Sequence, residues 1–555
     1  MQERGAGLHR AIGILACTWF VSATLYSALH IELGFDPAYH ASVAKNFALG
    51  EGWVSSYETT VPFNPDVTTG PTMLLPASAM IALFGNEIWV PAVTAALLQL
   101  LVFVLILAAL KPLMSGLRQF WVSAALLCAV FLLHAHTWWV TLTADFLVVL
   151  LTLLCALLLC RPPRLAGPHT TALAGMALGA ALLAKALAWF AVAGLVAYGL
   201  WRLAQGGAPR RAAQRAGLLL IGTLAVLLPW EIHKQDTLAG LDEAIRAERQ
   251  AYATDFFKTQ GTGIAELAAA ARPLRLIPEN LVRNGGLLLA HMRDRYGLPA
   301  PATIALLAWL LALTAWRLWH TQGRLQNFML LIGLIGSGQL VWFLCISASW
   351  NAKYALAPVT YSLVLLALAL VSRWSTLTVL LPACLLPLLF PPATQAYIER
   401  VLLYQGQQTA YTRDQLATLD FLQSLQNPPP LAGCGWVFAP WDFEYLMTGS
   451  GHFRDCRRVI AEQLERNDKG SEAWSGQPEF ILIASHVFWE FSAYRDLYLP
   501  VLRACSDQVL HRNDYFTVAH CQFRADSGVV PLGPQSPFTP EANNSLFVHK
   551  PAPIK

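Results

Sequence analysis

Long apolar runs recur through the first 392 residues of this chain, and almost no charged side chain interrupts them. Most of these runs approach the ~20 residues that a helix needs to cross the hydrocarbon layer of a bilayer. The composition agrees, since 55% of the 555 residues are hydrophobic and only 13% are charged. A soluble globular class is therefore disfavoured. The sequence predicts a polytopic α-helical membrane protein.

We predict a membrane module at residues 1–392 with about eleven transmembrane helices. Their approximate bounds are 11–29, 88–110, 119–136, 139–160, 168–185, 186–203, 216–230, 301–318, 327–346, 354–372 and 374–392. Arg4 and Arg10 precede the first run, as in a signal peptide, but no convincing cleavage site follows, and an uncleaved span is favoured. The apolar stretch 73–85 is too short to span comfortably and is interpreted as an interfacial or re-entrant helix.

The basic residues of the short loops indicate the orientation of the chain, because cytoplasmic loops carry an excess of Lys and Arg. With the N-terminus in the cytoplasm, every short basic loop falls on that side. These loops hold Lys111, Arg118, Arg161, Arg164, Arg202, Arg210, Arg211, Arg215, Arg317, Arg324 and Arg373. Two outer loops, 30–87 and 231–300, then face outward together with the tail at 393–555. We expect the functional surface outside the cytoplasm.

The tail at 393–555 alternates short apolar strands with turn-rich pieces, which predicts a soluble extracytoplasmic domain of mixed α/β type. Four cysteines lie outside the hydrophobic region, all of them in this tail: Cys434, Cys456, Cys505 and Cys521. An even set in an oxidising compartment predicts two disulfides of unknown pairing. Four unpaired thiols are the alternative. No Walker loop, dinucleotide fingerprint or zinc-type Cys/His spacing occurs, so nucleotide-driven chemistry is unsupported.

Ionisable residues are missing from the centres of the predicted spans and gather near their outer ends, which disfavours ion-coupled transport. They are Asp36, Asp145, Lys185, Glu231, His233 and Lys353. Asp145 is harder to explain as a structural residue than the lysines, because a carboxylate in the first turns of an apolar span costs a few kcal/mol unless it is paired or hydrated. Lys185 and Lys353 alternatively extend to the lipid headgroups. Asp36 alternatively caps a helix that Gly50 ends.

Several short motifs follow one another in a fixed order along the chain. They are Asp36 with AKNFALGEGW, NPDVTTGPTMLLPASAMIALFG, LTADFLVV with Asp145, AGMALGAALLAKALAW with Lys185, LLPWEIHK, and WNAKYALAPV with Lys353 and Tyr354. Their order resembles that of the GT-C glycosyltransferases that use polyprenyl-phosphate sugars, a family that includes the protein O-mannosyltransferases and the lipid A aminoarabinose transferase. The motifs cover most of residues 10–370. The resemblance implies GT-C architecture and an enzyme that moves a single sugar from a polyprenyl phosphate to an extracytoplasmic acceptor.

The chain differs from the family at two of these motifs. Several members have Asp-Glu where this chain has Asp36-Pro37, and the lipid A enzyme has Lys-Pro where this chain has Gly70-Pro71. Without that lysine, another cation must contact the donor phosphate. The candidates are Lys185, Lys353, Arg246 and Arg249, together with Arg272 and Arg275 of the outer loop, because ammonium and guanidinium groups bind phosphate oxygens.

Sugar transfer needs a base near the attacking hydroxyl and positive charge near the leaving phosphate. We assign Asp36 as the base, and in-line attack then inverts the anomeric centre. Asp145 is the second catalytic candidate, as an acceptor-orienting group or as the ligand of a divalent metal cation, the one cofactor considered. The metal ligands considered are Asp36, Asp145 and His40. The acceptor or auxiliary candidates are Tyr39, His40, Tyr354, Glu231 and His233.

The expected setting is the bacterial inner membrane, with the tail domain in the periplasm. The expected partners are the lipid-linked donor, membrane lipids and a lipid, glycan or protein acceptor, without nucleic acid. Two other functions stay open. One is a lipid-linked oligosaccharide ligase or polymerase, and the other is a lipid flippase or transporter without covalent chemistry.

Overall fold

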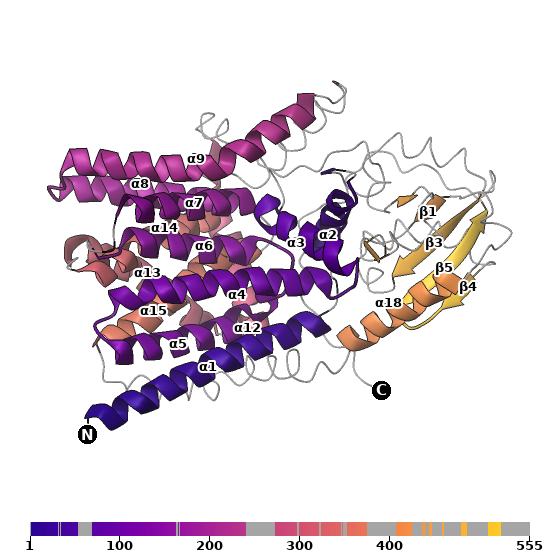
Figure 1. The fold of residues 1–555 in the computed structure, drawn as a ribbon, viewed down its shortest axis with the longest axis horizontal. Helices are drawn as coiled ribbons and strands as arrows, with labels where there is room; N and C mark the ends of the chain where they lie inside the picture. The colour runs from indigo at the N-terminus through magenta and orange to yellow at the C-terminus, as the bar shows by residue number, and fades with distance from the viewer. Residues whose placement is uncertain are drawn as a thin grey trace. The chain divides into compact units, whose positions relative to one another are not determined.

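The structure is a computed structural model of the chain. It describes residues 2–53, 69–239, 272–373 and 407–424 with a few short gaps, and short pieces of the remaining tail, chiefly 436–438, 443, 445–446, 458–459, 479–485 and 509–522. The chain divides into two compact units. The helical unit comprises Met1–Leu29, Asn64–Pro76 and Val93–Leu403, and the mixed unit comprises His30–Phe63, Ala77–Ala92 and Tyr404–Lys555. Long helices dominate the helical unit, and the sheet belongs to the mixed unit (Figure 1).

The helical unit is built from α-helices joined by short 3-10 segments. They are α1 (Gln2–His30), α4 (Val90–Leu110), η1 (Lys111–Leu113), α5 (Leu117–Ala135), η2 (His136–Trp139), α6 (Asp145–Leu159), α7 (Pro168–Ala184), η3 (Ala186–Ala188), α8 (Trp189–Ala204), α9 (Pro209–Ala239), α12 (Arg272–Tyr296), α13 (Ala300–His320), α14 (Arg324–Cys345), η4 (Ala352–Ala355) and α15 (Leu356–Arg373). Within the described ranges, six helices are long and apolar enough to cross a membrane, and five shorter apolar helices accompany them.

Every predicted span from 11–29 to 354–372 falls on one of these helices. The span predicted at 374–392 lies outside the described residues, so the count of eleven stays a prediction. The predicted span 139–160 begins late, at Asp145, because η2 and a short turn occupy its first residues. The segment 231–300, predicted as an outer loop, also contains helix, since α9 continues to Ala239 and α12 fills most of its second half.

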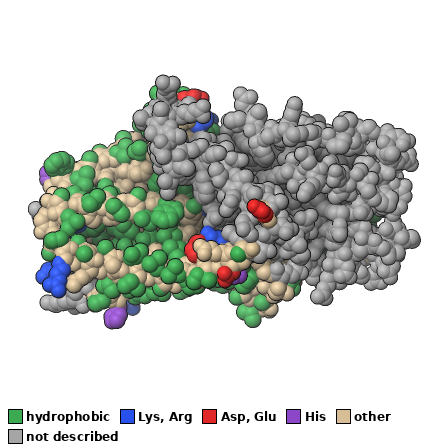
Figure 2. All heavy atoms as spheres, turned by 90° about the horizontal axis from the view of Figure 1, so that it is seen from above, with side chains coloured by type: hydrophobic (Ala, Val, Ile, Leu, Met, Phe, Trp, Pro, Cys, Tyr) green, Lys and Arg blue, Asp and Glu red, His purple; other side chains and the backbone are tan. Residues whose placement is uncertain are grey.

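Apolar side chains cover much of the described surface of the helical unit, as expected for helices that face lipid. Leu15, Ile221 and Trp319 are 70%, 63% and 83% exposed. Figure 2 shows hydrophobic side chains as a broad surface on the face in view, with charged side chains near its margins. Since a soluble protein rarely exposes so large an apolar area, this surface agrees with an integral membrane protein.

Helices α7 and α9 approach each other closely through glycines. A Cβ atom at Gly175 would collide with the carbonyl oxygen of Leu219, and one at Gly179 would lie 2.7 Å from the carbonyl oxygen of Thr223. The Thr223 hydroxyl donates to the carbonyl oxygen of Gly175 at 3.1 Å. Small residues four positions apart let two membrane helices pack backbone to backbone. This contact fixes α7, the helix that leads to Lys185.

An aromatic cluster holds the segment before α6. Trp139 lies edge to face with Phe20, at a centroid distance of 4.7 Å, and contacts Phe103, Phe131 and Phe146 at 5.9, 5.7 and 5.2 Å. Such pairs each contribute roughly 0.5–1.5 kcal/mol beyond their buried area. The Gln99 amide also donates to the carbonyl oxygens of Trp138 and Trp139, at 3.1 Å each. The start of α6 is therefore held firmly in place.

The mixed unit combines helices with a five-stranded sheet. Its elements are α2 (Phe35–Ala48), the second half of α3 (Pro71–Phe84), α18 (Gln407–Ser424), β1 (Trp436–Phe438), β2 (Arg458–Val459), β3 (Glu479–Ser485), β4 (Val509–Arg512) and β5 (Phe516–Gln522). The strand order is β2-β1-β3-β5-β4. Strand β1 pairs in parallel with β2 and β3, and β5 pairs antiparallel with β3 and β4. The boundary predicted at residue 393 stays a prediction.

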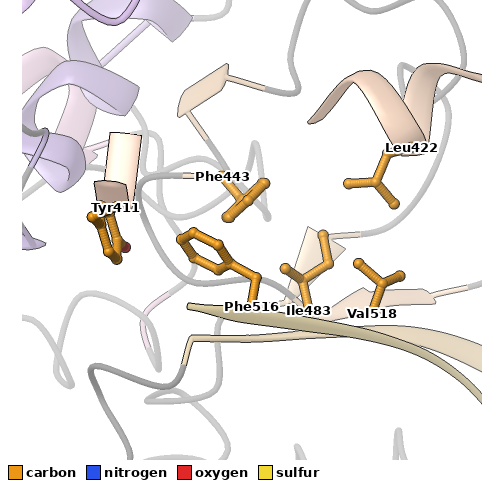
Figure 3. Close-up of a cluster of buried hydrophobic side chains, with 6 residues drawn as sticks. All are labelled: Tyr411, Leu422, Phe443, Ile483, Phe516 and Val518. Carbon is orange, nitrogen blue, oxygen red and sulfur yellow. The ribbon is translucent and has the colours of Figure 1, made fainter. Parts of the chain in front are cut away.

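A small hydrophobic core joins α18 to the sheet (Figure 3). It consists of Tyr411 and Leu422 of α18, Phe443, Ile483 of β3, and Phe516 and Val518 of β5. The β4–β5 turn is tied to the same helix by Asn513, whose amide donates to the carbonyl oxygen of Asp414 at 2.9 Å and to the Thr418 hydroxyl at 2.8 Å.

The cysteines predicted to form disulfides mostly lie outside the described residues. Cys434, Cys456 and Cys505 are not described, and Cys521 lies in β5 without a described side chain. Within the described residues, the cysteines of the helical unit are free: Cys17, Cys128, Cys155, Cys160 and Cys345. The two disulfides of the tail therefore stay a prediction.

Candidate functional site

Asp145 and Lys185 form a buried ion pair in the helical unit. Asp145 is the first residue of α6, and Lys185 directly follows the last residue of α7. The Lys185 Nζ lies 2.8 Å from both carboxylate oxygens of Asp145. The Asp145 side chain is 3% exposed and the Lys185 side chain 13%. Because two charges taken out of water require close pairing, each side chain fixes the position of the other.

The helix ends around this pair favour the charges that they carry. A helix N-terminus attracts negative charge, and Asp145 lies in the first turn of α6. A helix C-terminus attracts positive charge, and Lys185 caps the end of α7, with its backbone N–H bonded to the carbonyl oxygen of Ala181 at 3.1 Å. The sequence placed both residues near one membrane plane but did not predict that they pair.

Residues 69–72 connect the two helix ends. The backbone N–H of Gly70 donates to the carbonyl oxygen of Ala184 at 2.9 Å, and the Thr72 hydroxyl donates to the carbonyl oxygen of Ala180 at 2.8 Å. The Thr69 hydroxyl accepts the N–H of Ala144 at 3.2 Å. This segment therefore joins the residue before Asp145 to the residue before Lys185.

Gly70 is required at its position. A Cβ atom there would collide with the carbonyl oxygen of Leu183, so no larger residue fits unless the backbone moves. The lipid A enzyme has a lysine at the corresponding motif position. In this chain the close approach of the α7 backbone excludes a lysine side chain at position 70. Lys185, one residue beyond the acceptor of the Gly70 hydrogen bond, supplies a cation nearby.

Asp36 lies in the mixed unit, on a helix that is otherwise deeply buried. Helix α2 begins at Phe35, so Asp36 occupies its first turn rather than the capping position before it. The Asp36 side chain is exposed, although every residue from His40 to Asn46 is buried. Gly50 follows the helix with φ 83°, the left-handed conformation typical of a helix end. The prediction that Gly50 ends this helix is confirmed.

The neighbours of Asp36 on α2 have different environments. His40 is 5% exposed and lies beside Tyr39, with their ring centroids 5.5 Å apart. Tyr39 is half-buried. His40 lies one turn from Asp36, on the part of α2 that is packed on all sides. It therefore remains an auxiliary candidate in a buried setting.

The candidates around α9 form ordinary surface contacts. Glu231 pairs with Lys234 at 2.9 Å, and both side chains are partly exposed. His233 is exposed, with its ring centroid 5.3 Å from that of Trp230. An exposed ion pair three residues apart contributes little stability. Arg246 and Arg249 lie outside the described residues, and the side chains of Arg272 and Arg275 on α12 are not described.

Lys353 and Tyr354 lie in η4, between α14 and α15. Only the backbone of Lys353 is described. Tyr354 is buried, its carbonyl oxygen accepts the Gln339 amide at 3.3 Å, and its ring packs edge to face with Trp342 at 6.4 Å. Tyr354 thus has a packing role between the helices in addition to any contact with a substrate.

Three side chains of α12 that were not predicted from the sequence bind the end of α14. Asn284 is fully buried and donates to the carbonyl oxygens of Phe343 and Ser347 at 2.7 and 2.8 Å. Asn280 donates to the carbonyl oxygen of Cys345, and Arg283 also donates to that of Ser347, at 3.1 Å each. In the sequence, two asparagines four residues apart on one amphipathic helix were the feature that could have predicted these contacts. These contacts position the segment that leads to η4.

The described residues do not provide a set of ligands for the predicted metal ion. In that part of the chain, no group of three or more His, Cys, Asp or Glu side chains is arranged to hold a metal ion. Both oxygens of Asp145 accept from the Lys185 ammonium, whose charge repels a second cation. Asp145 therefore does not fit a metal ligand in this arrangement, and no step below uses one.

Comparisons with known proteins find similarity in structure. No protein-family model and no curated protein matches the chain. ArnT from Cupriavidus metallidurans bound to undecaprenyl phosphate matches with a TM-score of 0.56 and 15% identity, over 95% of this chain and 99% of that one. The same protein in the apo state matches with a TM-score of 0.53 and 15% identity, over 92% and 97%.

An oligosaccharyltransferase from Archaeoglobus fulgidus, in complex with Zn and sulfate, matches with a TM-score of 0.52 and 13% identity, over 88% of this chain and 69% of that one. At such identities the similarity concerns the fold. These neighbours are GT-C glycosyltransferases. The resemblance read from the order of the sequence motifs is therefore confirmed, and the chain has the fold of the GT-C glycosyltransferases.

Proposed function

We propose that this chain is an integral membrane glycosyltransferase that moves a single sugar from a polyprenyl-phosphate donor to an acceptor outside the cytoplasm. The buried Asp145–Lys185 pair carries the proposal, because it places a fixed cation at the ends of apolar helices. The shared fold supports it, since one neighbour of that fold was solved with undecaprenyl phosphate. The proposed setting is a bacterial inner membrane with a cytoplasmic N-terminus and a periplasmic tail domain.

The proposed reaction is a displacement at the anomeric carbon of the donor sugar. The acceptor hydroxyl forms the new bond to that carbon, and the bond from the carbon to the phosphate oxygen breaks. Asp36 takes the proton of the hydroxyl, and the polyprenyl phosphate leaves with the bonding electrons. Attack opposite the leaving group inverts the anomeric centre.

We assign Lys185 to the donor phosphate. A lysine ammonium has three N–H bonds, and the two oxygens of Asp145 accept from this one. Asp145 then keeps the ammonium at a fixed point rather than letting it extend to the lipid headgroups. Positive charge that is placed before the reaction stabilises the growing charge on the leaving phosphate without reorganisation. In this proposal Asp145 is a positioning residue for Lys185.

The remaining candidates complete the proposal. Lys353, Arg246 and Arg249 are additional cations for the donor phosphate, and Tyr39, His40 and Tyr354 are groups for the acceptor or the sugar. Glu231 and His233 are proposed only as peripheral groups, because Glu231 already pairs with Lys234 at the surface.

The test is turnover by purified protein with synthetic polyprenyl-phosphate sugars and a panel of lipid, glycan and peptide acceptors. We expect a glycosylated acceptor and the release of polyprenyl phosphate. Absence of turnover across the panel, with protein shown to be folded by its thermal transition, would contradict the proposal.

An oligosaccharide ligase or polymerase is a second candidate, because the archaeal oligosaccharyltransferase has the same fold. The lipid product separates the two functions. Mass spectrometry should detect polyprenyl phosphate under the first proposal and polyprenyl diphosphate under the second. A labelled donor that crosses vesicle membranes without being consumed would instead indicate a flippase.

A further inference from the structure

Three segments that are far apart in the sequence meet around Tyr445 in the mixed unit. They are α2 at Lys45, the turn between α3 and α4 at Asn86 and Glu87, and the tail at Tyr445 and Leu446. We call these five residues the Tyr445 cluster. The tail therefore contacts directly the helix that carries the proposed base, Asp36.

Asn86 makes the best-placed contacts of the Tyr445 cluster. Its amide nitrogen donates to the carbonyl oxygen of Leu446 at 2.8 Å and to that of Tyr445 at 3.0 Å. These distances are those of good N–H···O hydrogen bonds. Because both N–H bonds of one amide are engaged by successive carbonyls, the turn after α3 holds the tail backbone in one register.

Tyr445 also donates a hydrogen bond to the turn between α3 and α4. Its hydroxyl donates to the carbonyl oxygen of Glu87 at 3.1 Å, and its side chain is fully buried. Burial raises the pKa of the Tyr445 phenol, so the hydroxyl stays protonated and keeps donating. The turn and the tail are thus joined by hydrogen bonds in both directions.

Lys45 links this contact to α2. Its side chain is 1% exposed, and its Nζ lies 3.5 Å from the carbonyl oxygen of Tyr445 and 6.0 Å from the centre of the Tyr445 ring. A buried ammonium is costly unless polar or aromatic groups surround it. Any shift of the tail at Tyr445 therefore has an energetic cost at α2.

Helix α2 transmits this restraint to Asp36. Lys45 lies nine positions after Asp36, which corresponds to about 14 Å along a helix that rises about 1.5 Å per residue. A tilt of about 5° at the Lys45 end then moves Asp36 by about 1 Å. A displacement of this size at a reacting group is enough to cost roughly 10²-fold in rate.

We propose that the Tyr445 cluster is a positioning device, through which the tail holds α2 so that Asp36 is correctly oriented for its role. This proposal rests on the function proposed above for Asp36. In it, the tail contributes to the chemical step through backbone carbonyls and a buried tyrosine, and Asn86 is the positioning residue with the strongest effect.

The main test compares Asn86→Leu with a matched control in the same unit. Asn86→Leu keeps a similar volume and removes both donors. Asn513→Leu also removes two amide hydrogen bonds, which join the β4–β5 turn to α18, and it removes the bonds that the Asn513 Oδ1 accepts from the N–H groups of Tyr515 and Phe516. We expect kcat to fall by about 10-fold or more in Asn86→Leu with the donor KM within a few-fold. Asn513→Leu should lower the melting temperature at least as much while keeping kcat.

A double-mutant cycle identifies the route of the effect. If Asn86 acts through Asp36, Asn86→Leu should cost activity in the native background and almost nothing in the Asp36→Asn background. Equal losses in both backgrounds would overturn the proposal. If Asn86→Leu does not fold, Tyr445→Phe provides the same cycle, because it removes only the hydroxyl contact with Glu87. We expect a few-fold loss of kcat from that change.

Hydrogen exchange of the α2 amides tests the positioning role of the Tyr445 cluster independently of sugar transfer. The amides of α2 should exchange faster in Asn86→Leu than in Asn513→Leu, whether or not the protein transfers sugars. Faster exchange without any wild-type turnover would support the positioning contact and reject the glycosyltransferase. Unchanged exchange of α2 in a folded Asn86→Leu protein would reject the positioning contact, even if the wild-type enzyme is active.

Discussion

Asp36 is an exposed carboxylate on a buried helix, so its removal should affect chemistry more than folding. We expect Asp36→Asn to lower turnover by ~10²-fold or more, the usual loss when a general base is removed. The lost charge in the first turn should cost only about 0.3–1 kcal/mol of stability. Turnover and the melting temperature, measured in the same detergent, check this prediction.

Asp420→Asn is the matched control for this change, because Asp420 is another exposed carboxylate on a helix, in α18. It should leave both turnover and the melting temperature nearly unchanged. If Asp36→Asn also behaves in this way, Asp36 is not the base. Asp36→Ala should then lower stability without a specific loss of turnover, as expected for a purely structural carboxylate.

Substitutions of Lys185 and Asp145 should have interdependent effects on the free energy of unfolding but different effects on turnover. Lys185→Met leaves the buried Asp145 carboxylate unpaired, which should cost about 3–5 kcal/mol of unfolding free energy. The double change Lys185→Met with Asp145→Asn should recover much of that stability, since no buried charge remains. Turnover should stay low in both variants, because the phosphate cation is missing.

The measurements for this pair are thermal unfolding and the donor KM. A double variant that regains both stability and turnover would show that the pair is only structural. Asp145→Asn alone should raise the donor KM while Lys185 is retained, because the ammonium loses its fixed position.

At the scale of elements, the contact between α7 and α9 sets the position of the helix end that carries Lys185. Gly175→Ala places a methyl group against the carbonyl oxygen of Leu219, so the helices must separate. We expect a loss of about 1–3 kcal/mol, typical of overpacking, together with a higher donor KM. Thermal unfolding and kinetics test both effects.

Gly199→Ala on α8 is the control for this substitution, because nothing lies within 4 Å of a Cβ atom there. The added methyl group should stabilise the helix by up to ~1 kcal/mol through its intrinsic propensity. A Gly175→Ala protein that is as stable as Gly199→Ala would mean that α7 and α9 do not pack as closely as the structure has them.

At the scale of the whole molecule, the mixed unit has a consequence for membrane topology. Residues 30–63, 77–92 and 404–555 form one compact unit, and Asn86 is hydrogen-bonded to Tyr445 within it. We therefore predict that these segments lie on one side of the membrane, so that the chain between residues 92 and 404 crosses it an even number of times. The predicted span at 374–392 makes the expected number of crossings even.

Cysteine labelling tests this topology. Leu49→Cys and Asp420→Cys, both at exposed positions of the mixed unit, should react with a membrane-impermeant maleimide in intact cells. Arg210→Cys, at an exposed position in the first turn of α9 and on the side predicted to be cytoplasmic, should react only after lysis. The protein with its native cysteines alone gives the background. Labelling of Leu49→Cys and Asp420→Cys from opposite sides of the membrane would show that these two residues do not belong to one compact unit.

The sequence alone predicted the apolar helices that the structure describes between residues 11 and 372, and the positions of charge near their ends. This was possible because a helix in lipid satisfies its own backbone, so an apolar run about 20 residues long is a local signal. Asp145 was predicted near the start of the span 139–160 for that reason, and it is the first residue of α6. The order of the short motifs also identified the fold that the structural neighbours share.

The tertiary structure alone decided which of these groups meet. The pairing of Asp145 with Lys185 depends on how α6 packs against α7, and the need for glycine at position 70 depends on the approach of the Leu183 carbonyl. The contact of Asn86 with Tyr445 joins residues that no periodic pattern relates. Steric fit and hydrogen bonds between distant segments depend on three-dimensional placement, which local apolar patterns in a sequence do not specify.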